Sequence, residues 1–312
     1  MIISIMRERT KRQDLPPKNK TARVEMVGTP IGNLGDLTPR AREALASCDL
    51  VLCEDTRRTR QLLSAFEISK PLERLDENIT QARMEKILSK IRDENLHAVF
   101  VTDAGTPGVS DPGAWLVAMA TEQGVDVSPV PGVSAVTALL SVCGFHQTAF
   151  VFRGFFPRKN KDQISEIEQA QSCDMARVFI WFESAQRLTK TLAQIAQLCP
   201  SVRIIAAKEL TKQYEKIFRG DAAEICAKVE HELAEHGEKG EWVFAVCFDE
   251  VKKPNDLNNT ESDWTAILEA LLIGGVSVSD AARQVSQRFG VSRKHVYAEA
   301  LKIYQKKNHG GA

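Results

Sequence analysis

The 312-residue chain lacks the features that define membrane, secreted and metal-binding proteins. No apolar run approaches the roughly 18 residues that a membrane helix needs, and residues 1–20 contain no apolar stretch long enough for a signal peptide. The seven cysteines are an odd number without a C-x-x-C pair, which favours buried, reduced thiols over disulfides or a metal site. Net charge is also absent, because 41 basic residues balance 41 acidic ones. We therefore expect a soluble, cytoplasmic protein without a bound metal.

Two common nucleotide fingerprints, G-x-G-x-x-G and G-x-x-x-x-G-K-[ST], are absent as well. In their place, a loop rich in glycine and proline follows the apolar run Val24–Val27. Thr38 and Pro39 then mark the cap and the first residue of a helix. Gly28 and the glycines after it leave room for a ligand to approach the backbone. An ordinary turn between strand and helix and a ligand-binding loop explain this segment about equally well.

Apolar runs of strand length alternate with helical stretches in the first half of the chain, which predicts a parallel sheet with helices on both faces. A second set of strands has fewer crossovers and predicts a separate mixed or antiparallel sheet. The expected strands are Val24–Val27, Leu50–Cys53, Ala98–Val101 and Val125–Val130, then Ala149–Phe152, Val178–Phe182, Arg203–Ala207, Ile217–Phe218 and Trp242–Phe248. We expect an α/β domain at residues 23–146 and a second at 147–250, with a site in the cleft between them.

The two ends of the chain are basic. Residues 1–22 predict a disordered basic tail, and the polar stretch 251–262 predicts a linker. Three short helices are expected after it, at Trp264–Ile273, Ser279–Phe289 and Arg293–Tyr304, with the last two spaced as in a helix-turn-helix. Residues 276–312 contain seven lysines and arginines against two acids, a net charge of +5. Nucleic-acid binding by a domain at 263–308 is the specific interpretation, and a small bundle with a solvated basic face is the alternative.

Two further loops follow predicted strands and are too rich in glycine, proline and small residues to be simple connections. Thr102–Gly113 reads TDAGTPGVSDPG, and Val130–Leu140 reads VPGVSAVTALL. The first loop can supply one or two carboxylates and contains no lysine or arginine, so it suits a ligand with an amino group, hydroxyls or an adenine edge better than a triphosphate. Because the carboxyl ends of parallel strands share one edge of a sheet, three such loops together predict a ligand pocket there.

The strings VGTPIGNLGDLTPRA, EDTRRT, TDAGTPGVSDPG, PGVSA, FRGFFPRK, AKELTK and KGEWVF occur in this order between Val24 and Phe248. In this, the chain resembles the tetrapyrrole-methylase superfamily and, within it, the ribosomal RNA small subunit methyltransferase I family. The resemblance implies two α/β domains with the active-site cleft between them, a small C-terminal helical domain and a homodimer. It also implies 2′-O-methylation of a cytidine in small-subunit (16S) ribosomal RNA with S-adenosylmethionine as methyl donor. Where the family often has histidine, asparagine and glutamate in a row, this chain has Asp76-Glu77-Asn78, so no role for that histidine is carried over.

By the same resemblance, a set of residues from both domains is expected to bind the donor. These are Thr29, Pro30, Asp103, Ala104, Gly105, Thr106, Pro107, Ser134, Ala135, Phe182, Leu210, Gly240, Glu241 and Trp242.

Methyl transfer to a ribose hydroxyl requires positioning and a group that accepts the proton. The candidates are Glu54 and Asp55 after the second strand, and Lys208 and Glu209 at the start of AKELTK. For Asp55, a helix cap is an equally good interpretation.

Cations at three places are expected to bind RNA: Arg57, Arg58, Arg60, Arg158, Lys159, Lys161, Arg293 and Lys294. Phe155 and Phe156, beside the middle group, are candidates for stacking on a nucleotide or for the core. Two other functions share part of this pattern: a methyltransferase acting on a tetrapyrrole or a diphthamide precursor, and a non-enzymatic helix-turn-helix regulator.

Overall fold

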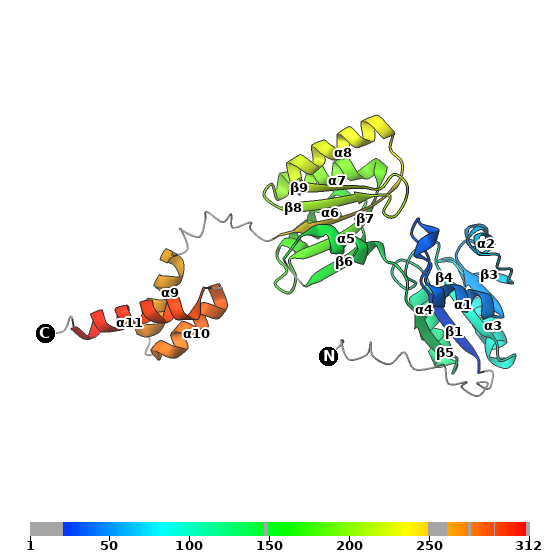
Figure 1. The fold of residues 1–312 in the computed structure, drawn as a ribbon, viewed down its shortest axis with the longest axis horizontal. Helices are drawn as coiled ribbons and strands as arrows, with labels where there is room; N and C mark the ends of the chain where they lie inside the picture. The colour runs from blue at the N-terminus through cyan, green and yellow to red at the C-terminus, as the bar shows by residue number, and fades with distance from the viewer. Residues whose placement is uncertain (1–20, 147–148, 249–260, 274–275, 290, 310–312) are drawn as a thin grey trace. The chain divides into compact units, whose positions relative to one another are not determined.

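The structure is a computed structural model that describes residues 21–146, 149–248, 261–273, 276–289 and 291–309 (Figure 1). The chain divides into two compact units, Met1–Asp249 and Glu250–Ala312. The predicted basic tail, apart from residues 21 and 22, lies outside the described residues, as do residues 251–260 of the predicted linker. Within the described residues, no helix is both long enough and apolar enough to cross a membrane.

The first sheet of the larger unit has five strands, all parallel, in the order β3-β2-β4-β1-β5. Its elements are β1 (Arg23–Val27), η2 (Leu34–Asp36), α1 (Pro39–Ser47), β2 (Leu50–Cys53), α2 (Thr56–Ala65), β3 (Leu72–Arg74), α3 (Gln81–Asp93), β4 (His97–Val101), α4 (Gly113–Glu122) and β5 (Asp126–Val130). Residues of α3 and α4 pack on one face and residues of α1 and α2 on the other. The parallel sheet predicted from the sequence is confirmed; only the three-residue β3 was not expected.

Local sequence accounts for these elements. Strands β2 and β4 are buried along their whole length, as central strands of a covered parallel sheet must be. Strand β2 is a continuous apolar run, and β4 is one after its first residue, His97. Helix α1 begins as predicted, with Pro39 in its first turn and the Thr38 hydroxyl accepting the Ala41 N–H at 3.1 Å. Gly28 and Gly132 allow the ends of β1 and β5 to meet, because a Cβ on Gly28 would lie 2.7 Å from the Cα of Gly132.

The second sheet has five strands in the order β6-β7-β10-β8-β9, with one parallel pair, β6 and β7, and three antiparallel ones. Its elements are α5 (Ala135–Cys143), β6 (Phe150–Phe155), α6 (Asn160–Gln171), β7 (Val178–Ser184), α7 (Ala185–Leu198), β8 (Arg203–Lys208), β9 (Lys216–Asp221), α8 (Ala222–His236) and β10 (Glu241–Cys247). The predicted mixed sheet is therefore confirmed. Helices α6, α7 and α8 cover one face.

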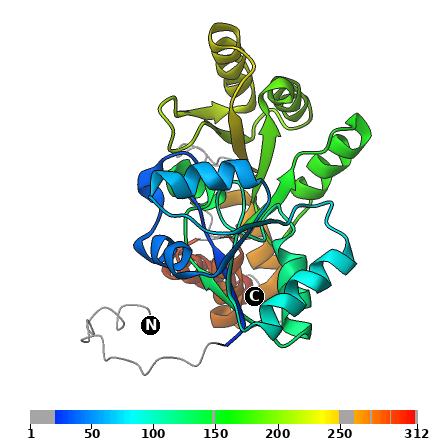
Figure 2. The ribbon, with the colours of Figure 1, turned by 90° about the vertical axis from the view of Figure 1, so that its right-hand side faces the viewer.

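The other face of the second sheet packs against α5 and against Ile31 from the loop after β1. Ile31, Leu139 and Val243 share one core cluster, so the two sheets are joined through buried side chains. A view turned by 90° shows the two groups of strands within this unit (Figure 2). The joint between the two sheets is consequently a packed interface within one compact unit, and it lies beside the site described below.

The smaller unit contains α9 (Glu261–Ile273), α10 (Val278–Phe289) and α11 (Arg293–His309). Trp264 and Leu268 of α9, Val285 of α10 and Val296 of α11 form its core. The Ser292 carbonyl accepts the N–H groups of His295 and Val296 and so begins α11. The three helices predicted for this segment are confirmed.

Candidate functional site

A pocket of about 450 Å³ lies at the carboxyl end of the parallel sheet, where loops of the first sheet meet strand ends of the second. Pockets of this size hold small molecules in many α/β proteins. Its lining from the first sheet's side is Ile31, Glu54, Arg58, Thr102, Asp103, Ala104, Gly105, Thr106, Val109, Ser110, Asp111, Ser134 and Ala135. From the second sheet come Phe155, Phe182, Glu183, Ser184, Leu210, Gly240, Glu241, Trp242 and Val243.

The loop between β4 and α4 forms the floor of this pocket and is held at both ends. Thr29 and Gly105 exchange two backbone hydrogen bonds, of 2.9 and 3.1 Å, which bind the loop to the strand-end segment after β1. Gly105 has φ +87°, a conformation that glycine adopts without strain. At the other end, the Asp111 carboxylate accepts the N–H groups of Gly108 and Gly113, each at 2.8 Å. The backbone of this loop is therefore preorganised.

Glu54, Asp103 and Arg58 form the charged corner of the pocket. The Asp103 N–H donates to Oε1 of Glu54 at 3.0 Å, and the Arg58 guanidinium lies 3.2 Å from Oδ2 of Asp103. Burial raises the pKa of Glu54 above its usual value, and the neighbouring carboxylates of Asp103 and Asp111 add to this, whereas the hydrogen bond from Asp103 opposes it. Among the described residues, Oε2 of Glu54 takes part in no hydrogen bond. Glu54 thus combines raised basicity with a free oxygen in the pocket.

Glu209 holds the wall formed by the ends of β8 and β10. Its N–H donates to the Glu241 carbonyl at 2.9 Å, and its Oε1 accepts the Glu241 N–H at 2.8 Å. Lys212 binds the carboxylates of both Glu209 and Glu241. Burial would raise the pKa of Glu209, but hydrogen bonds from Glu241 and Lys212 outweigh it and lower the pKa. The Glu209 carboxylate therefore stabilises this wall through its hydrogen bonds and does not itself line the pocket.

Most residues expected to bind the donor come together in this lining: Asp103, Ala104, Gly105, Thr106, Ser134, Ala135, Phe182, Leu210, Gly240, Glu241 and Trp242. Thr29, Pro30 and Pro107 do not line it; Thr29 is buried and supports Gly105 instead. The Trp242 ring belongs to the core on the far face of the second sheet, stacked on Phe218 at 5.8 Å. It follows that Trp242 contributes to the pocket mainly through its backbone.

Of the expected proton acceptors, only Glu54 lines the pocket. The Asp55 carboxylate caps α2 by accepting the Arg57 N–H at 2.7 Å. The Arg57 guanidinium lies 2.9 Å from the same carboxylate, and together these contacts hold the pKa of Asp55 far below its usual range. Lys208 is buried on the far face of the sheet, where its ammonium lies 2.9 Å from Glu232 and over the Trp242 ring. The contacts of Asp55 and Lys208 therefore stabilise the fold, and neither residue lines the pocket.

The expected RNA-binding cations lie in three places. Arg58 lines the pocket, and Arg57 and Arg60 are exposed beside it on α2. Arg158, Lys159 and Lys161 are exposed at the end of β6 and the start of α6, and Arg293 and Lys294 are exposed at the start of α11 in the smaller unit.

Sequence reasoning missed several lining residues, among them Val109, Asp111, Glu183 and Ser184. The last two were recognisable, because they are the polar residues that end the apolar strand β7. For Phe155 and Phe156 the sequence left stacking and core both open. The structure separates them: Phe156 is 1% exposed and Phe155 is 63% exposed and lines the pocket.

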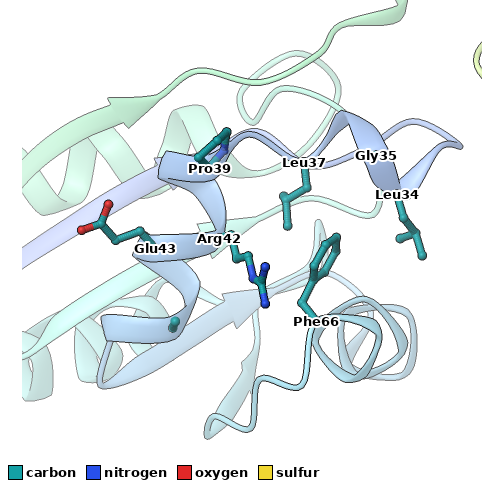
Figure 3. A pocket seen from close by; sticks show the side chains of 8 residues that line it. Leu34, Gly35, Leu37, Pro39, Arg42, Glu43 and Phe66 are labelled. Carbon is teal, nitrogen blue, oxygen red and sulfur yellow. The ribbon is translucent and has the colours of Figure 1, made fainter. Parts of the chain in front are cut away.

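A second hollow lies on the surface of α1 (Figure 3). Its lining includes Leu34, Leu37, Arg42 and Phe66, with the Arg42 guanidinium 5.6 Å from the centre of the Phe66 ring. Glu43 points away from this contact in Figure 3. This second hollow includes none of the residues predicted to bind a ligand. Its open, largely apolar wall offers no convergent set of polar groups.

Comparison with known proteins identifies the family to which this chain belongs. Residues 23–226 match the sequence profile of the Tetrapyrrole (Corrin/Porphyrin) Methylases, and residues 259–303 match that of the RsmI C-terminal helix-turn-helix domain. The chain therefore belongs to the tetrapyrrole methylase family, whose members are methyltransferases that use S-adenosylmethionine.

Within that family, the chain is similar to proteins named ribosomal RNA small subunit methyltransferase I. The protein from Thermotoga maritima is 40% identical over 66% of this chain and 90% of its own length. The one from Xylella fastidiosa is 36% identical over 88% and 97%, and the one from Escherichia coli O157:H7 is 34% identical over 93% and 98%. The chain belongs with them to the ribosomal RNA small subunit methyltransferase I family.

Solved structures show the same fold at low sequence identity. A diphthine synthase aligns with TM-score 0.55 and 14% identity, over 72% of this chain and 89% of that one. A putative cobalamin synthesis related protein from Corynebacterium diphtheriae aligns with TM-score 0.53 and 15% identity, over 73% and 98%.

The pocket suits the methyl donor chemically. The donor carries a cationic sulfonium and amino group, and the lining contains the carboxylates of Glu54, Asp103 and Asp111. The half-buried ring of Phe182 and the buried side chains of Leu210 and Val243 supply an apolar wall for its adenosine part. The lining therefore fits S-adenosylmethionine.

Proposed function

We propose that this protein methylates the 2′-hydroxyl of a cytidine in small-subunit (16S) ribosomal RNA, with S-adenosylmethionine as donor. The relatives' names support the RNA as substrate, and the smaller, basic helical unit supports binding to it. The observation that carries the proposal is the pocket itself, in which the preorganised β4–α4 loop and the half-buried Glu54 meet.

The donor-binding residues in this proposal are those of the lining that come from Asp103–Thr106, Ser134–Ala135, Phe182, Leu210 and Gly240–Trp242. Thr29 and Glu209 act indirectly, because their hydrogen bonds hold Gly105 and Glu241 in place. When bound, the donor supplies an electrophilic methyl group, and its sulfur keeps the electron pair of the bond that breaks. Holding the two reactants in line provides much of the acceleration in such a displacement.

Glu54 is the proposed general base. A ribose hydroxyl is a poor nucleophile, so a base that takes its proton raises the rate of attack on the methyl carbon. Oε2 of Glu54 makes no hydrogen bond within the described part of the chain and can accept that proton, whereas Asp55 is held by Arg57 and Lys208 by Glu232. The raised pKa of Glu54 brings its basicity closer to neutral pH, where general bases work best.

RNA phosphates are the proposed partners of Arg58, Arg60 and the basic loop at Arg158, Lys159 and Lys161. Arg293 and Lys294 of the smaller, helical unit are proposed as further phosphate contacts. We further propose that the protein acts as a homodimer in the cytoplasm, where its ribosomal substrate is found.

The test is transfer of labelled methyl from S-adenosylmethionine to small ribosomal subunits that lack the modification, followed by nuclease digestion of the RNA. Wild-type protein should yield a 2′-O-methylated cytidine. Glu54→Gln should lower kcat by roughly 10²- to 10⁴-fold, the usual contribution of a general base. Binding of S-adenosylhomocysteine should persist in this variant, and the exposed Glu122→Gln on α4 should behave as wild type.

The pH profile separates base catalysis from a loss of structure. Wild-type kcat should rise with pH through the raised pKa of Glu54, and that limb should be missing in Glu54→Gln. Full turnover by a folded Glu54→Gln variant would remove Glu54 from the catalytic role. Donor binding without transfer to subunits or naked RNA would favour another acceptor such as a tetrapyrrole, and no donor binding would favour a regulator.

A further inference from the structure

Strand β6 contains a bulge at the point where it reaches the pocket. Its pairing with β7 runs Phe152 to Ile180 and then Phe155 to Phe182, so three residues of β6 advance while two of β7 do. Gly154, inside the bulge, has φ +72°. An extra residue with glycine in the left-handed region is a recurrent way to redirect a side chain next to an active site.

The bulge reverses the direction in which the next side chains point. Phe152 and Phe182 pack on the α5 face of the sheet. Regular alternation would turn Phe155 to the opposite face, because side chains on a strand alternate. With the bulge, Phe155 lies edge-on to Phe182, with ring centres 5.5 Å apart, and lines the pocket. Phe156 instead enters the core on the far side, 5.6 Å from Trp181.

An ion pair between the half-buried Arg187 and the buried Glu183 holds the backbone just beyond Phe155. The Arg187 guanidinium contacts the carbonyl oxygens of Phe156 at 3.4 Å and Pro157 at 3.5 Å, and it pairs with the Glu183 carboxylate. Glu183 is itself buried and accepts the Thr191 hydroxyl at 3.1 Å. The Phe155 ring is consequently presented from a fixed backbone although 63% of the residue is exposed.

Phe155 and Val109 are the large apolar residues of the lining that are at least one third exposed, at 63% and 36%. Single exposed apolar residues are ordinary on protein surfaces. Here, however, the bulge turns the exposed ring toward a pocket that Glu54 also lines. The basic loop at Arg158, Lys159 and Lys161 follows Phe155 directly in the sequence. An enzyme that must reach a ribose hydroxyl needs its nucleotide out of the base stack, and aromatic or apolar side chains commonly hold such a base.

We propose that Phe155 is the stacking platform for the base of the nucleotide that is methylated, with Val109 as a second apolar contact. This inference rests on the proposed function, because it assigns the RNA acceptor to the Phe155 end of the pocket. The donor then occupies the end formed by Asp103–Thr106 and Gly240–Val243. Glu54 lies within the same lining and receives the proton of the 2′-hydroxyl.

The experiment measures methyl transfer to unmodified small subunits with Phe155→Ala, Phe155→Leu and Phe155→Tyr. Phe150→Ala is the matched control, because Phe150 is also an exposed phenylalanine of β6, at 43%, but does not line the pocket. Loss of one stacked base predicts a rise in KM for subunits of roughly 5- to 150-fold in Phe155→Ala. Phe155→Tyr should stay within about threefold of wild type, Phe155→Leu should fall between, and Phe150→Ala should be unchanged.

Two further measurements on the same variants decide what the ring contacts. Unchanged affinity for S-adenosylhomocysteine by calorimetry and an unchanged mass by light scattering are expected. A parallel loss of donor affinity in Phe155→Ala would assign the ring to the donor, and a change of oligomeric state would assign it to a subunit contact; either overturns the proposal. So does a KM equal to that of Phe150→Ala. Absence of turnover in the wild-type protein would instead overturn the proposed function, and this inference with it.

Discussion

Replacing Glu232 should destabilise this protein by an electrostatic mechanism. Glu232 lies on α8, is 5% exposed, and accepts hydrogen bonds from Lys208 at 2.9 Å and Lys216 at 2.5 Å. Lys208 is 6% exposed, whereas the Lys216 side chain is 43% exposed and reaches water. Glu232→Gln keeps the volume of the side chain but leaves the buried Lys208 ammonium without a countercharge.

Breaking a buried ion pair by removing one partner typically costs about 3–5 kcal/mol. Because Gln still accepts a hydrogen bond, we expect the lower end, about 3 kcal/mol, for Glu232→Gln. In a unit of this size each 1 kcal/mol lowers Tm by roughly 2–4 °C, so the expected shift is about 6–12 °C. Lys208→Met should cost less, since Glu232 keeps Lys216 as a partner. The double variant Lys208→Met, Glu232→Leu should recover much of the loss, because it leaves no unpaired buried charge.

Scanning calorimetry of the wild type and these variants measures the shifts, and adding the single variant Glu232→Leu closes the cycle that gives the coupling between Lys208 and Glu232. A Tm change below about 2 °C in Glu232→Gln would show that the Lys208 ammonium does not need Glu232 as a countercharge. The same proteins test the predicted catalytic role of Lys208. Loss of methyl transfer in Lys208→Met with its Tm and donor binding retained would show that Lys208 acts in catalysis despite its position.

The pH dependence of stability has a definite sign. Burial would raise the pKa of Glu232, but hydrogen bonds from Lys216 and Lys208 outweigh it and lower the pKa below its usual value of 4.5. A carboxylate with a lowered folded-state pKa stabilises the fold above its unfolded pKa and loses that contribution as the pH falls through the folded value. Wild-type stability should therefore decline below about pH 4.5 more steeply than that of Glu232→Gln.

Two other substitutions test how the pocket is built. Gly28→Ala should destabilise the fold, because its Cβ would lie 2.7 Å from Gly132 backbone atoms. Chemical denaturation should show a loss of roughly 1–3 kcal/mol or more in the free energy of unfolding. A normal unfolding midpoint would show that the ends of β1 and β5 separate easily. Glu209→Gln should weaken binding of S-adenosylhomocysteine about tenfold while Tm changes little, because it weakens the contacts of Glu209 with Glu241 and Lys212 and leaves the core unchanged. Unchanged affinity in calorimetry would mean that Lys212 and the backbone hydrogen bonds are enough to hold this wall of the pocket.

Local sequence was enough to predict most strands, the helices of the first sheet and the edge at which the pocket lies. Apolar runs such as β2 and β4 are recognisable because central strands of a covered sheet are buried on both faces. Loops rich in glycine and proline after those strands marked the ligand edge. Strand β3 (Leu72–Arg74) was not predicted, since three residues with a charged pair give no periodic pattern. Helices α6 and α7 of the second half were not predicted either.

The roles of charged residues were not predictable in the same way. Glu54, Asp55, Lys208 and Glu209 are all polar residues at strand ends, and the sequence offers no reason to choose among them. The role of each residue depends on its hydrogen-bond partner, and in three cases that partner is distant in sequence. Glu54 binds the Asp103 backbone, Lys208 binds Glu232 and Glu209 binds Glu241.

By itself, then, the sequence determined the α/β class, the three pocket loops and the family, because these depend on residue type and local spacing. Tertiary structure alone decided which carboxylate faces the pocket and which neighbouring phenylalanine does. Phe155 and Phe156 are chemically identical, and a single left-handed glycine before them sends one to the pocket and the other to the core. The face of the sheet to which a side chain points depends on the register between its strand and the paired strand, and a local sequence pattern does not specify that register.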